Sequence, residues 1–285
     1  MFDINTRILG LVGYPLGHSI SPLLHNSTIK ERGLNYIYLP FQVEEERLRE
    51  VIEGLKALNF RGINITIPYK KKVLPLLDSI APQAVRIGSV NTIVNEENIL
   101  TGYNTDFTGL IRMIKEDGGF DIRGKKVLII GAGGTASTAG TAVLSEGAAA
   151  VYLLNRTSAK GEKLVEKWRK DYPDTVLKAG PLEPIYYNSF IKEIELLIDT
   201  TPVGMAPEID EQPVITASSL HSNMLVVDLV YNPEKTTLLK AAEKAGAAGL
   251  NGMGMLLYQG IESFKLWTGY EIDPGEWRKL TKSAK

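Results

Sequence analysis

The sequence predicts an α/β protein with two domains. The chain has 285 residues, which is about the length of two ordinary domains. Short apolar runs alternate with helical patterns through the first hundred residues, and this order is typical of a mostly parallel sheet. After a polar connector at residues 117–124, a strand, a glycine turn and a helix follow one another. They predict a second domain of the Rossmann type.

The composition is that of a globular protein and excludes several classes of function. Hydrophobic residues make up 44%, charged residues 23%, and the formal net charge is −1, which argues against a nucleic-acid partner. No stretch reaches the roughly 20 apolar residues of a membrane helix, so no membrane contact is expected. The absence of cysteine excludes disulfides and thiolate chemistry and fits a cytoplasmic location. The three histidines are scattered, so no metal site is expected, and His18 and His25 are interpreted as structural.

Local signals predict the elements of the first domain. Ser21 and Pro22 are a strong helix start, with serine as the N-cap and proline at the first helical position, and Gly33 ends that helix. The run Asn-Glu-Glu at residues 95–97 joins two strands in a hairpin. Strands are expected at residues 8–12, 36–43, 61–67, 89–94 and 98–103. Helices are expected at residues 21–32, 44–55, 73–77, 81–87 and 107–115.

The second domain continues the alternation of strand and helix. Strands are expected at residues 126–130, 150–154, 196–199, 225–230 and 248–250, and helices at 135–146, 158–170 and 235–245. Two more helices, at 253–266 and 274–282, follow the last strand and could pack back on the first domain. One domain is therefore expected to comprise residues 1–106 and 252–285, and the other residues 107–251.

The strongest local signal is the run V-L-I-I-G-A-G-G-T-A. A strand ends, glycines turn the backbone tightly and a helix begins, so free N–H groups and the positive end of the helix face a pyrophosphate. Gly131 and Gly133 occupy the first two glycine positions of G-x-G-x-x-G, and Ala136 occupies the third. The alternative is a glycine turn that serves only close packing. Dinucleotide contacts are expected at Gly131, Ala132, Gly133, Gly134, Thr135 and Ala136.

The next strand indicates which dinucleotide is bound. It ends in Asn155, Arg156 and Thr157, where NAD sites usually place an acid for the ribose 2′-hydroxyl. An arginine offers a fork of donors to a 2′-phosphate, which a carboxylate would repel, and Lys160 follows as a second cation. We therefore expect NADP rather than NAD. The alternative is an ordinary exposed arginine.

Lys70 stands at the end of the run R-G-I-N-I-T-I-P-Y-K. Ile63, Ile65 and Ile67 alternate with polar residues and are expected to lie in the core. Pro68 stops the strand because it has no N–H to donate. Lys70 then lies just past the carboxyl end of the strand, at the sheet edge where α/β proteins bind ligands. The alternative is that all three consecutive lysines simply face solvent.

Four other polar residues carry weaker signals. Ser19 and Ser21 lie at the start of a helix, where their hydroxyls and the free helix N–H groups suit a carboxylate, but Ser21 can also be a simple cap. Asn91 is an amide in an apolar strand and needs a partner if it is buried. Asp106 precedes a helix and is either a cap or a catalytic group.

Taken together, these stretches resemble the shikimate dehydrogenase family. The matching motifs occur in one order along almost the whole chain: G-Y-P-L-G-H-S-I-S-P-L-L-H-N at 13–26, N-I-T-I-P-Y-K at 64–70, G-S-V-N-T at 88–92, G-Y-N-T-D at 102–106, G-A-G-G-T-A at 131–136, N-R-T at 155–157, T-T-P-V-G-M at 200–205, D-L-V-Y-N-P at 228–233 and G-M-L-L-Y-Q at 254–259. The resemblance implies an oxidoreductase that reduces 3-dehydroshikimate to shikimate with NADPH, in chorismate and aromatic amino acid biosynthesis. It also implies an N-terminal substrate-binding catalytic domain, a Rossmann NADP domain, and C-terminal helices that return to the first domain.

The resemblance assigns roles to individual residues. Ser19 and Ser21 would bind the substrate carboxylate, and Lys70 would be the acid/base beside the reacting oxygen, with Asp106 as its partner. Thr66, Asn91, Asp106 and Gln259 would hold the ring hydroxyls, and Tyr231 would line the cleft. Further implied cofactor contacts are Thr200, Pro202, Val203, Leu229, Gly252 and Met255. Residues 134–138 lack an arginine that relatives often have, which is expected to weaken the phosphate contact. No role follows for Asn64.

Three alternatives remain open at this point. A quinate/shikimate dehydrogenase would use a wider range of substrates or NAD. A non-catalytic ligand sensor of the same fold is expected to lose Lys70 or Asp106, and both are present. The H-S-I-S-P and N-T-D stretches argue against a dehydrogenase that acts on folates. A small-molecule ligand is expected in each case, and a homodimer is a further expectation for which one sequence identifies no surface.

Overall fold

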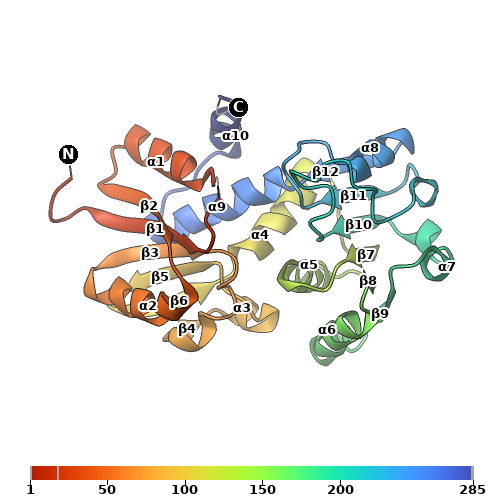
Figure 1. Ribbon diagram of the computed structural model, residues 1–285, viewed down its shortest axis with the longest axis horizontal. Coiled ribbons are helices and arrows are strands. Elements are labelled where there is room, and N and C mark those ends of the chain that lie inside the picture. The colour runs from red at the N-terminus through yellow and green to blue at the C-terminus, as the bar shows by residue number, and fades with distance from the viewer. Residues whose placement is uncertain (1, 18, 284–285) are drawn as a thin grey trace. The chain divides into compact units, whose positions relative to one another are not determined.

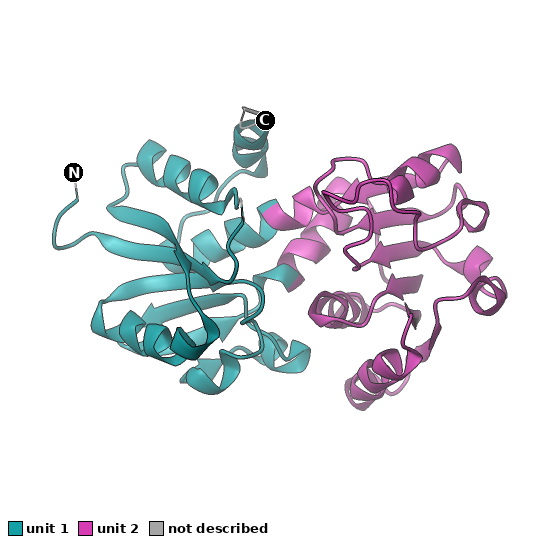
Figure 2. Cartoon of the chain, viewed as in Figure 1, with its two compact units in different colours: residues 1–106, 257–285 teal, residues 107–256 magenta. Residues whose placement is uncertain are grey.

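The computed structural model describes residues 2–17 and 19–283, so the predicted structural histidine His18 lies outside the described residues. The chain divides into two compact units, Met1–Asp106 with Leu257–Lys285, and Phe107–Leu256 (Figure 2). The divisions fall within two helices, α4 (Thr105–Arg112) and α9 (Met253–Thr268). The sequence placed the second division at residue 252, whereas in the structure it lies a few residues later, between Leu256 and Leu257.

The first unit is built on a six-stranded sheet with the order β2-β1-β3-β5-β6-β4 (Figure 1). Strands β1, β2 and β3 are parallel, whereas β5 runs antiparallel to both β3 and β6. The strands are β1 (Arg7–Gly13), β2 (Tyr36–Gln42), β3 (Phe60–Ile65), β4 (Ser79–Ile80), β5 (Thr92–Glu96) and β6 (Ile99–Tyr103). The expected hairpin is confirmed, but its turn lies later than predicted, because Asn95 and Glu96 belong to β5. The two turn residues are Glu97 and Asn98, which have the positive φ angles that a tight hairpin turn requires.

Helices cover both faces of this sheet. Alternate residues of β3 point to opposite sides, so they contact different layers of helices. Ile63 and Ile65 pack in the core beneath α2, whereas Asn64 reaches Tyr38 and Ser263 on the other face. The helical segments of the unit, besides parts of α4 and α9, are α1 (Ser21–Glu31), η1 (Glu45–Arg47), α2 (Leu48–Ala57), η2 (Leu74–Leu76), α3 (Pro82–Ile87) and α10 (Pro274–Ser283).

Two local predictions in this unit are wrong. Ile67 is 72% exposed and is not part of the core. The ladder between β1 and β3 ends at Ile65, and the chain then turns so that Tyr69 becomes buried in the core instead. Ser21 is the first residue of α1 and not its cap: Ile20 holds the N-cap position, and no side chain caps the helix.

The second unit is a six-stranded sheet of parallel strands with the order β12-β11-β10-β7-β8-β9. Its strand order reverses between β7 and β10, as in the doubly wound dinucleotide-binding fold. The strands are β7 (Lys126–Ile130), β8 (Ala150–Asn155), β9 (Val176–Pro181), β10 (Leu196–Asp199), β11 (Leu225–Asp228) and β12 (Ala248–Asn251). The predicted fold class is therefore confirmed, although the edge strand β9 was not predicted.

The helical segments of the second unit, besides parts of α4 and α9, are α5 (Gly134–Ser145), α6 (Ser158–Asp171), α7 (Pro184–Tyr187), η4 (Ile191–Glu193), η5 (Ala217–Ser219) and α8 (Thr237–Lys244). The three long helices, α5, α6 and α8, lie close to their predicted positions, whereas the short segments α7, η4 and η5 were not predicted. The helix predicted to run to residue 115 is regular only to Arg112 and then widens into a π-helical turn, η3 (Met113–Asp117). Gly254 lies against this turn, where an added Cβ would approach Met113 and Asp117 within 2.7 Å.

His25 lies at the centre of an aromatic cluster in the first unit. Its ring stacks on Tyr38 at 4.3 Å and contacts Phe264, Trp267 and Trp277. The side chain is buried, and its Nδ1 has no hydrogen-bond partner. Burial therefore lowers the pKa of His25 to about 3, because the charged ring would lose its hydration among the aromatic side chains. The interpretation of His25 as structural is confirmed.

This burial gives an expected pH dependence of stability. The unfolded chain binds a proton at His25 below pH 6.5, but the folded chain does not do so until about pH 3. The contribution of His25 to stability should therefore fall as the pH falls through this range, by a few kcal/mol at pH 4 relative to a variant without this group. Urea unfolding at pH 7 and pH 4 checks this when wild type is compared with His25→Phe, which keeps an aromatic ring but cannot take up a proton. The same change in stability between pH 7 and pH 4 in both proteins would contradict this account of His25.

Candidate functional site

The predicted substrate residues of the first unit lie at one edge of its sheet. Strands β1, β3 and β6 end at this edge, and β5, which runs the other way, begins there. Lys70 follows β3 and Asp106 follows β6. Asn91 directly precedes β5 and does not lie inside a strand as the sequence predicted, because β5 begins at Thr92. Ser19 and Ser21 follow β1. Four separate stretches of sequence are thus brought together by strand direction alone.

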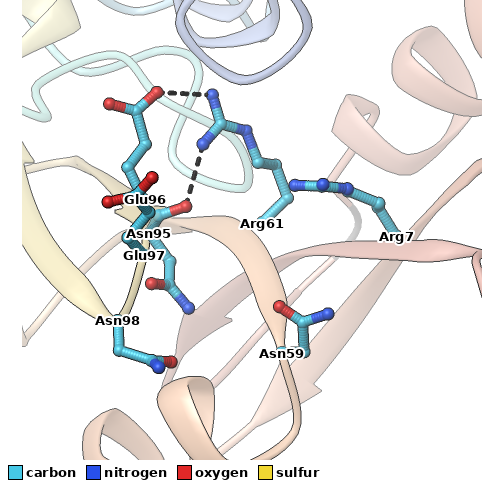
Figure 3. A pocket seen from close by; sticks show the side chains of 7 residues that line it. All are labelled: Arg7, Asn59, Arg61, Asn95, Glu96, Glu97 and Asn98. Carbon is cyan, nitrogen blue, oxygen red and sulfur yellow. Dashed lines mark hydrogen bonds and ion pairs between the residues drawn. The ribbon is translucent and has the colours of Figure 1, made fainter.

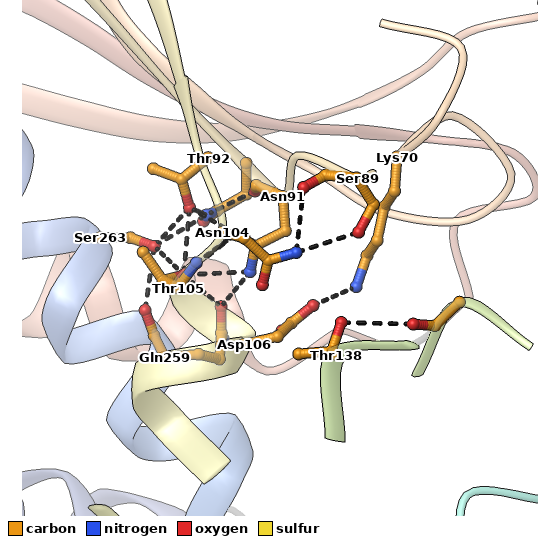
Figure 4. Close-up of polar contacts among 12 residues, drawn as sticks. Lys70, Ser89, Asn91, Thr92, Asn104, Thr105, Asp106, Thr138, Gln259 and Ser263 are labelled. Carbon is orange, nitrogen blue, oxygen red and sulfur yellow. Dashed lines mark hydrogen bonds and ion pairs between the residues drawn. The ribbon is translucent and has the colours of Figure 1, made fainter. Parts of the chain in front are cut away.

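Lys70 and Asp106 form an ion pair at this edge (Figure 4). The lysine Nζ lies 2.7 Å from the aspartate Oδ2, and the two side chains are 32% and 15% exposed. The main-chain oxygen of Lys70 accepts a hydrogen bond from Val90 N–H at 2.8 Å, which fixes the lysine beside the start of β5. Lys71 and Lys72 are exposed, as expected of the rest of the lysine run.

Asn91 is the centre of a buried hydrogen-bond network next to this ion pair (Figure 4). Its Oδ1 accepts the Thr105 main-chain N–H at 2.7 Å, and its Nδ2 donates to the Thr105 hydroxyl at 3.0 Å and to Gln259 Oε1 at 3.4 Å. The buried side-chain amide of Asn91 therefore makes its hydrogen bonds to other groups of the protein. Because Thr105 precedes Asp106 directly, the network also fixes the carboxylate that contacts Lys70.

Asn64 has a structural role that the sequence did not reveal. Its Oδ1 accepts a hydrogen bond from the Tyr38 hydroxyl at 2.8 Å. Its Nδ2 donates to the hydroxyls of Thr92 and Ser263, each at 3.1 Å. One side chain thus joins β2, β3, β5 and α9 on the sheet face opposite α2.

Ser263, Thr92 and Thr105 are site residues that the sequence reasoning missed. All three are buried, and their hydroxyls contact one another at 2.8 to 3.1 Å. The available signal for Ser263 was its spacing of four residues from Gln259, which places both on one face of α9. Thr105 stood within the recognised N-T-D run but received no role.

The serines and Thr66 lie on loops that run side by side after β1 and β3. Tyr14 N–H donates to Ile67 O at 3.1 Å, and Thr66 N–H donates to Val12 O at 2.9 Å. A Cβ at Gly13 would lie 2.3 Å from the Thr66 methyl group, so glycine permits this close approach. Ser19 is exposed and Ser21 partly buried, and the Ser19 hydroxyl accepts the Ser21 N–H at 3.3 Å.

The glycine turn of the second unit fits a dinucleotide phosphate. Gly131 has φ +103°, and an added Cβ would lie 2.4 Å from the Thr200 hydroxyl, so only glycine suits this position. Gly133 and Gly134 are exposed, and a Cβ at either would meet nothing within 4 Å. No side chain caps α5, which leaves its first N–H groups facing this open space. Bare backbone donors at a helix N-terminus are the usual partners of a pyrophosphate.

The other predicted cofactor residues follow neighbouring strands of the same sheet. Asn155 ends β8, and its Nδ2 donates to Thr157 O at 2.9 Å, which shapes the turn that presents the exposed Arg156 and Lys160. The remaining cofactor residues follow β10, β11 and β12, whose carboxyl ends lie at the same edge as the glycine turn: Thr200, Pro202, Val203, Leu229, Gly252 and Met255. The predicted cleft residue Tyr231 follows β11 at this edge.

A polar pocket lies at the opposite end of the first unit's sheet, where β1 and β3 begin (Figure 3). Arg61 donates to Trp267 O, Asn95 O and Glu96, so it fastens the end of α9 to the β5–β6 hairpin. Arg7 lies beside Arg61, and none of the predicted site residues lines this pocket. Within the described residues, no cluster of three or more metal-ligating side chains occurs, and no helix has the length and apolar character to cross a membrane.

Family models match three parts of the chain. Residues 11–93 match the shikimate dehydrogenase substrate binding domain, and residues 113–234 match the shikimate / quinate 5-dehydrogenase model. Residues 252–275 match the shikimate 5'-dehydrogenase C-terminal domain.

Whole-chain comparisons agree with these matches. The chain is 52% identical over 284 residues to the NADP(+) shikimate dehydrogenase of Halothermothrix orenii, covering 100% of this chain and 98% of that protein. A crystal structure of shikimate 5-dehydrogenase from Listeria monocytogenes with shikimate and NAD is similar at 36% identity and a TM-score of 0.93, covering 98% of each chain. The Thermus thermophilus enzyme with NADP(H) and shikimate is similar at 31% identity and a TM-score of 0.86, covering 98% of this chain and 100% of that one.

The role of Asn64 gives a testable expectation. Asn64→Ala should lower the free energy of unfolding by about 3 kcal/mol, because it removes the partner of three buried hydroxyls. Urea unfolding monitored by tryptophan fluorescence measures this loss. The matched control is Asn35→Ala, which removes an exposed amide and should change stability by about 0.5 kcal/mol or less. Equal stability of the two variants would show that the buried network does not depend on Asn64.

Proposed function

Because the chain belongs to the shikimate dehydrogenase family, we propose that it catalyses the reversible NADPH-dependent reduction of 3-dehydroshikimate to shikimate, on the route to chorismate and the aromatic amino acids. The observation that carries the proposal is the ion pair of Lys70 and Asp106 beside a buried network of hydroxyls and amides. A small polyhydroxylated acid needs this combination of charge and hydrogen-bonding groups.

The substrate is proposed to bind on the first unit. Ser19 and Ser21 would hold its carboxylate, since they stand at the N-terminus of α1, where the N-cap residue Ile20 makes no side-chain hydrogen bond to the helix. Thr66, Asn91 and Gln259, with Asp106, would hold the ring hydroxyls. Asn91 and Gln259 already bond to each other, at 3.4 Å, which supports their acting on one ligand. Tyr231, which is 41% exposed, is the proposed cleft residue of the second unit.

Lys70 is proposed to handle the proton of the reaction. A ketone that gains hydride develops negative charge on its oxygen, and an ammonium group at that oxygen stabilises the charge and supplies a proton from Nζ. Asp106 orients the lysine by accepting one of its three N–H groups at 2.7 Å. Asp106 is the only hydrogen-bond partner of this Nζ among the described residues, so the other two N–H groups can face a ligand oxygen.

NADP is proposed to bind on the second unit and supplies the hydride when bound. The N–H groups from Gly133 to Ala136 would hold the pyrophosphate. Arg156, Thr157 and Lys160 would bind the 2′-phosphate at the end of β8. The loops after β10, β11 and β12 would then line the nicotinamide end. The absence of cysteine suits the reducing cytoplasm, where we place the reaction.

The Lys70–Asp106 pair and the turn after β8 also help to separate the proposed function from the alternative functions. Both members of the Lys70–Asp106 pair are present and in contact, which argues against a non-catalytic ligand sensor. The turn after β8 carries arginine and lysine and no acid, which favours NADP over NAD. Assays that pair shikimate and quinate with NADP and with NAD separate a strict enzyme from a broader one. We expect fast turnover only with shikimate and NADP.

Removal of the proposed proton donor tests the mechanism. In Lys70→Ala, kcat for shikimate oxidation should fall by about 10²- to 10⁴-fold, the usual contribution of a positioned acid/base, while KM changes little. NADPH absorbance measures both constants. Lys71→Ala is the matched control, because it removes the neighbouring exposed lysine and should leave kcat near that of wild type. Near-normal turnover in Lys70→Ala would overturn the proposed mechanism.

Reversal of one charge tests the cofactor assignment. Arg156→Asp should raise KM for NADP by about 10- to 100-fold, because it replaces a charge-assisted hydrogen bond to phosphate with repulsion. KM for NAD, which lacks that phosphate, should change far less. Lys163→Asp makes the same kind of charge change at an exposed position farther along α6 and serves as the control. If both variants raise KM for NADP equally, the effect is a general one of surface charge, and the assignment of Arg156 fails.

A further inference from the structure

Two buried carboxyl groups stand side by side at the cofactor edge of the second unit. Asp199 ends β10 and Asp228 ends β11, and the two residues are partners in the parallel ladder. They are 2% and 1% exposed. On the other side of Asp199, the ladder partner is Ile130 of β7, which offers no charge. Neither carboxyl group has a role in the proposed reaction.

Each of these carboxyl groups shapes the loop that follows its own strand. Asp199 Oδ1 accepts the Thr201 N–H at 2.8 Å, and Asp228 Oδ1 accepts the Val230 N–H at 3.0 Å. Asp228 Oδ2 also accepts the hydroxyl of Thr236, which caps α8. The main-chain oxygen of Asp199 accepts the Leu229 N–H at 3.0 Å, so the two loops are tied together.

The loop after Asp199 also fits tightly against the glycine turn. The Thr200 hydroxyl donates to Ile130 O at 2.6 Å, and Thr200 N–H donates to the same oxygen at 3.0 Å. That hydroxyl is the atom that excludes a side chain at Gly131. A change in the conformation of this loop would therefore displace the backbone of the glycine turn directly.

We propose that Asp199 is a positioning residue for cofactor binding: by accepting the Thr201 N–H, it fixes the loop from Thr200 to Gly204 against the glycine turn. This inference rests on the proposed function, since Thr200, Pro202 and Val203 are proposed cofactor contacts. Asp199 itself lies beneath the loop and touches no ligand. Its effect is exerted through the main chain of Thr201.

The environment of Asp199 favours its uncharged form. Burial raises the pKa of Asp199 to about 7, and the neighbouring Asp228 adds to this effect, although the hydrogen bond from Thr201 opposes it. Above this pH the carboxyl group loses its proton, and the loop must admit water to solvate the buried charge. The affinity for the cofactor therefore falls as the pH rises through 7, because the loop is held less firmly in its binding conformation.

Three variants test the proposal by NADPH binding and by hydrogen exchange in the ligand-free protein. Asp199→Ala removes the acceptor, so it should weaken NADPH binding about two- to tenfold and speed exchange in peptides that contain Thr201. Asp199→Asn keeps a neutral acceptor and should bind NADPH as wild type does at pH 6. Between pH 6 and pH 8.5, wild type should lose affinity relative to Asp199→Asn, whose amide does not titrate. The 2′-phosphate of the ligand titrates equally in both titrations and cancels from this comparison.

Leu197→Ala is the matched control, because Leu197 lies in the same strand and its removal leaves a core cavity without touching the loop. It should destabilise the unit but leave NADPH affinity and its pH dependence unchanged. Wild-type affinity in Asp199→Ala, an equal loss in Leu197→Ala, or the same pH dependence in wild type and Asp199→Asn would each overturn the proposal. Failure of the proposed function is distinguishable, since it would appear as wild-type protein that binds NADPH but does not oxidise shikimate.

Discussion

The requirement that buried amides be hydrogen-bonded organises the first unit. Asn64 and Asn91 are 6% and 3% exposed, and between them their side chains contact elements from β2 to α9. An amide buried without partners is costly, so each contact also fixes the element that supplies it. This explains how the ion pair of Lys70 and Asp106 is held on loops at a sheet edge. The carboxylate is fixed through Thr105 and Asn91, and the lysine through its main-chain bond to Val90.

Features that depend on neighbouring residues could be predicted from the sequence. The glycine turn was found because a strand, a tight turn and a helix follow one another within ten residues, and the steric demands at Gly131 act over the same short range. Strand direction then placed Lys70 at the edge where ligands bind. The pairing of Lys70 with Asp106, 36 residues apart, was supplied by the family resemblance, because no local pattern joins them.

Features that depend on tertiary contacts could not be predicted. Ile67 continued the alternation of β3, but the ladder to β1 ends at Ile65, and alternation indicates burial only while a strand is paired. Asn64 bonds to Ser263 across 199 residues, and neither position carries a signal that names the other. The strand β9 was missed because it lies at the sheet edge, where its exposed residues hide the apolar pattern.

Two of the buried ionisable groups, His25 and Asp199, act on stability with opposite signs. Between about pH 3 and 6.5 the unfolded chain binds one more proton at His25 than the folded chain does, so stability rises with pH. Between 3.8 and about 7 the folded chain keeps a proton at Asp199 that the unfolded chain has lost, so stability falls with pH. For unfolding of the whole chain, the two slopes cancel where these ranges overlap. A flat stability profile in mildly acidic solution is thus compatible with two strongly perturbed groups, and each becomes visible only when the other is replaced.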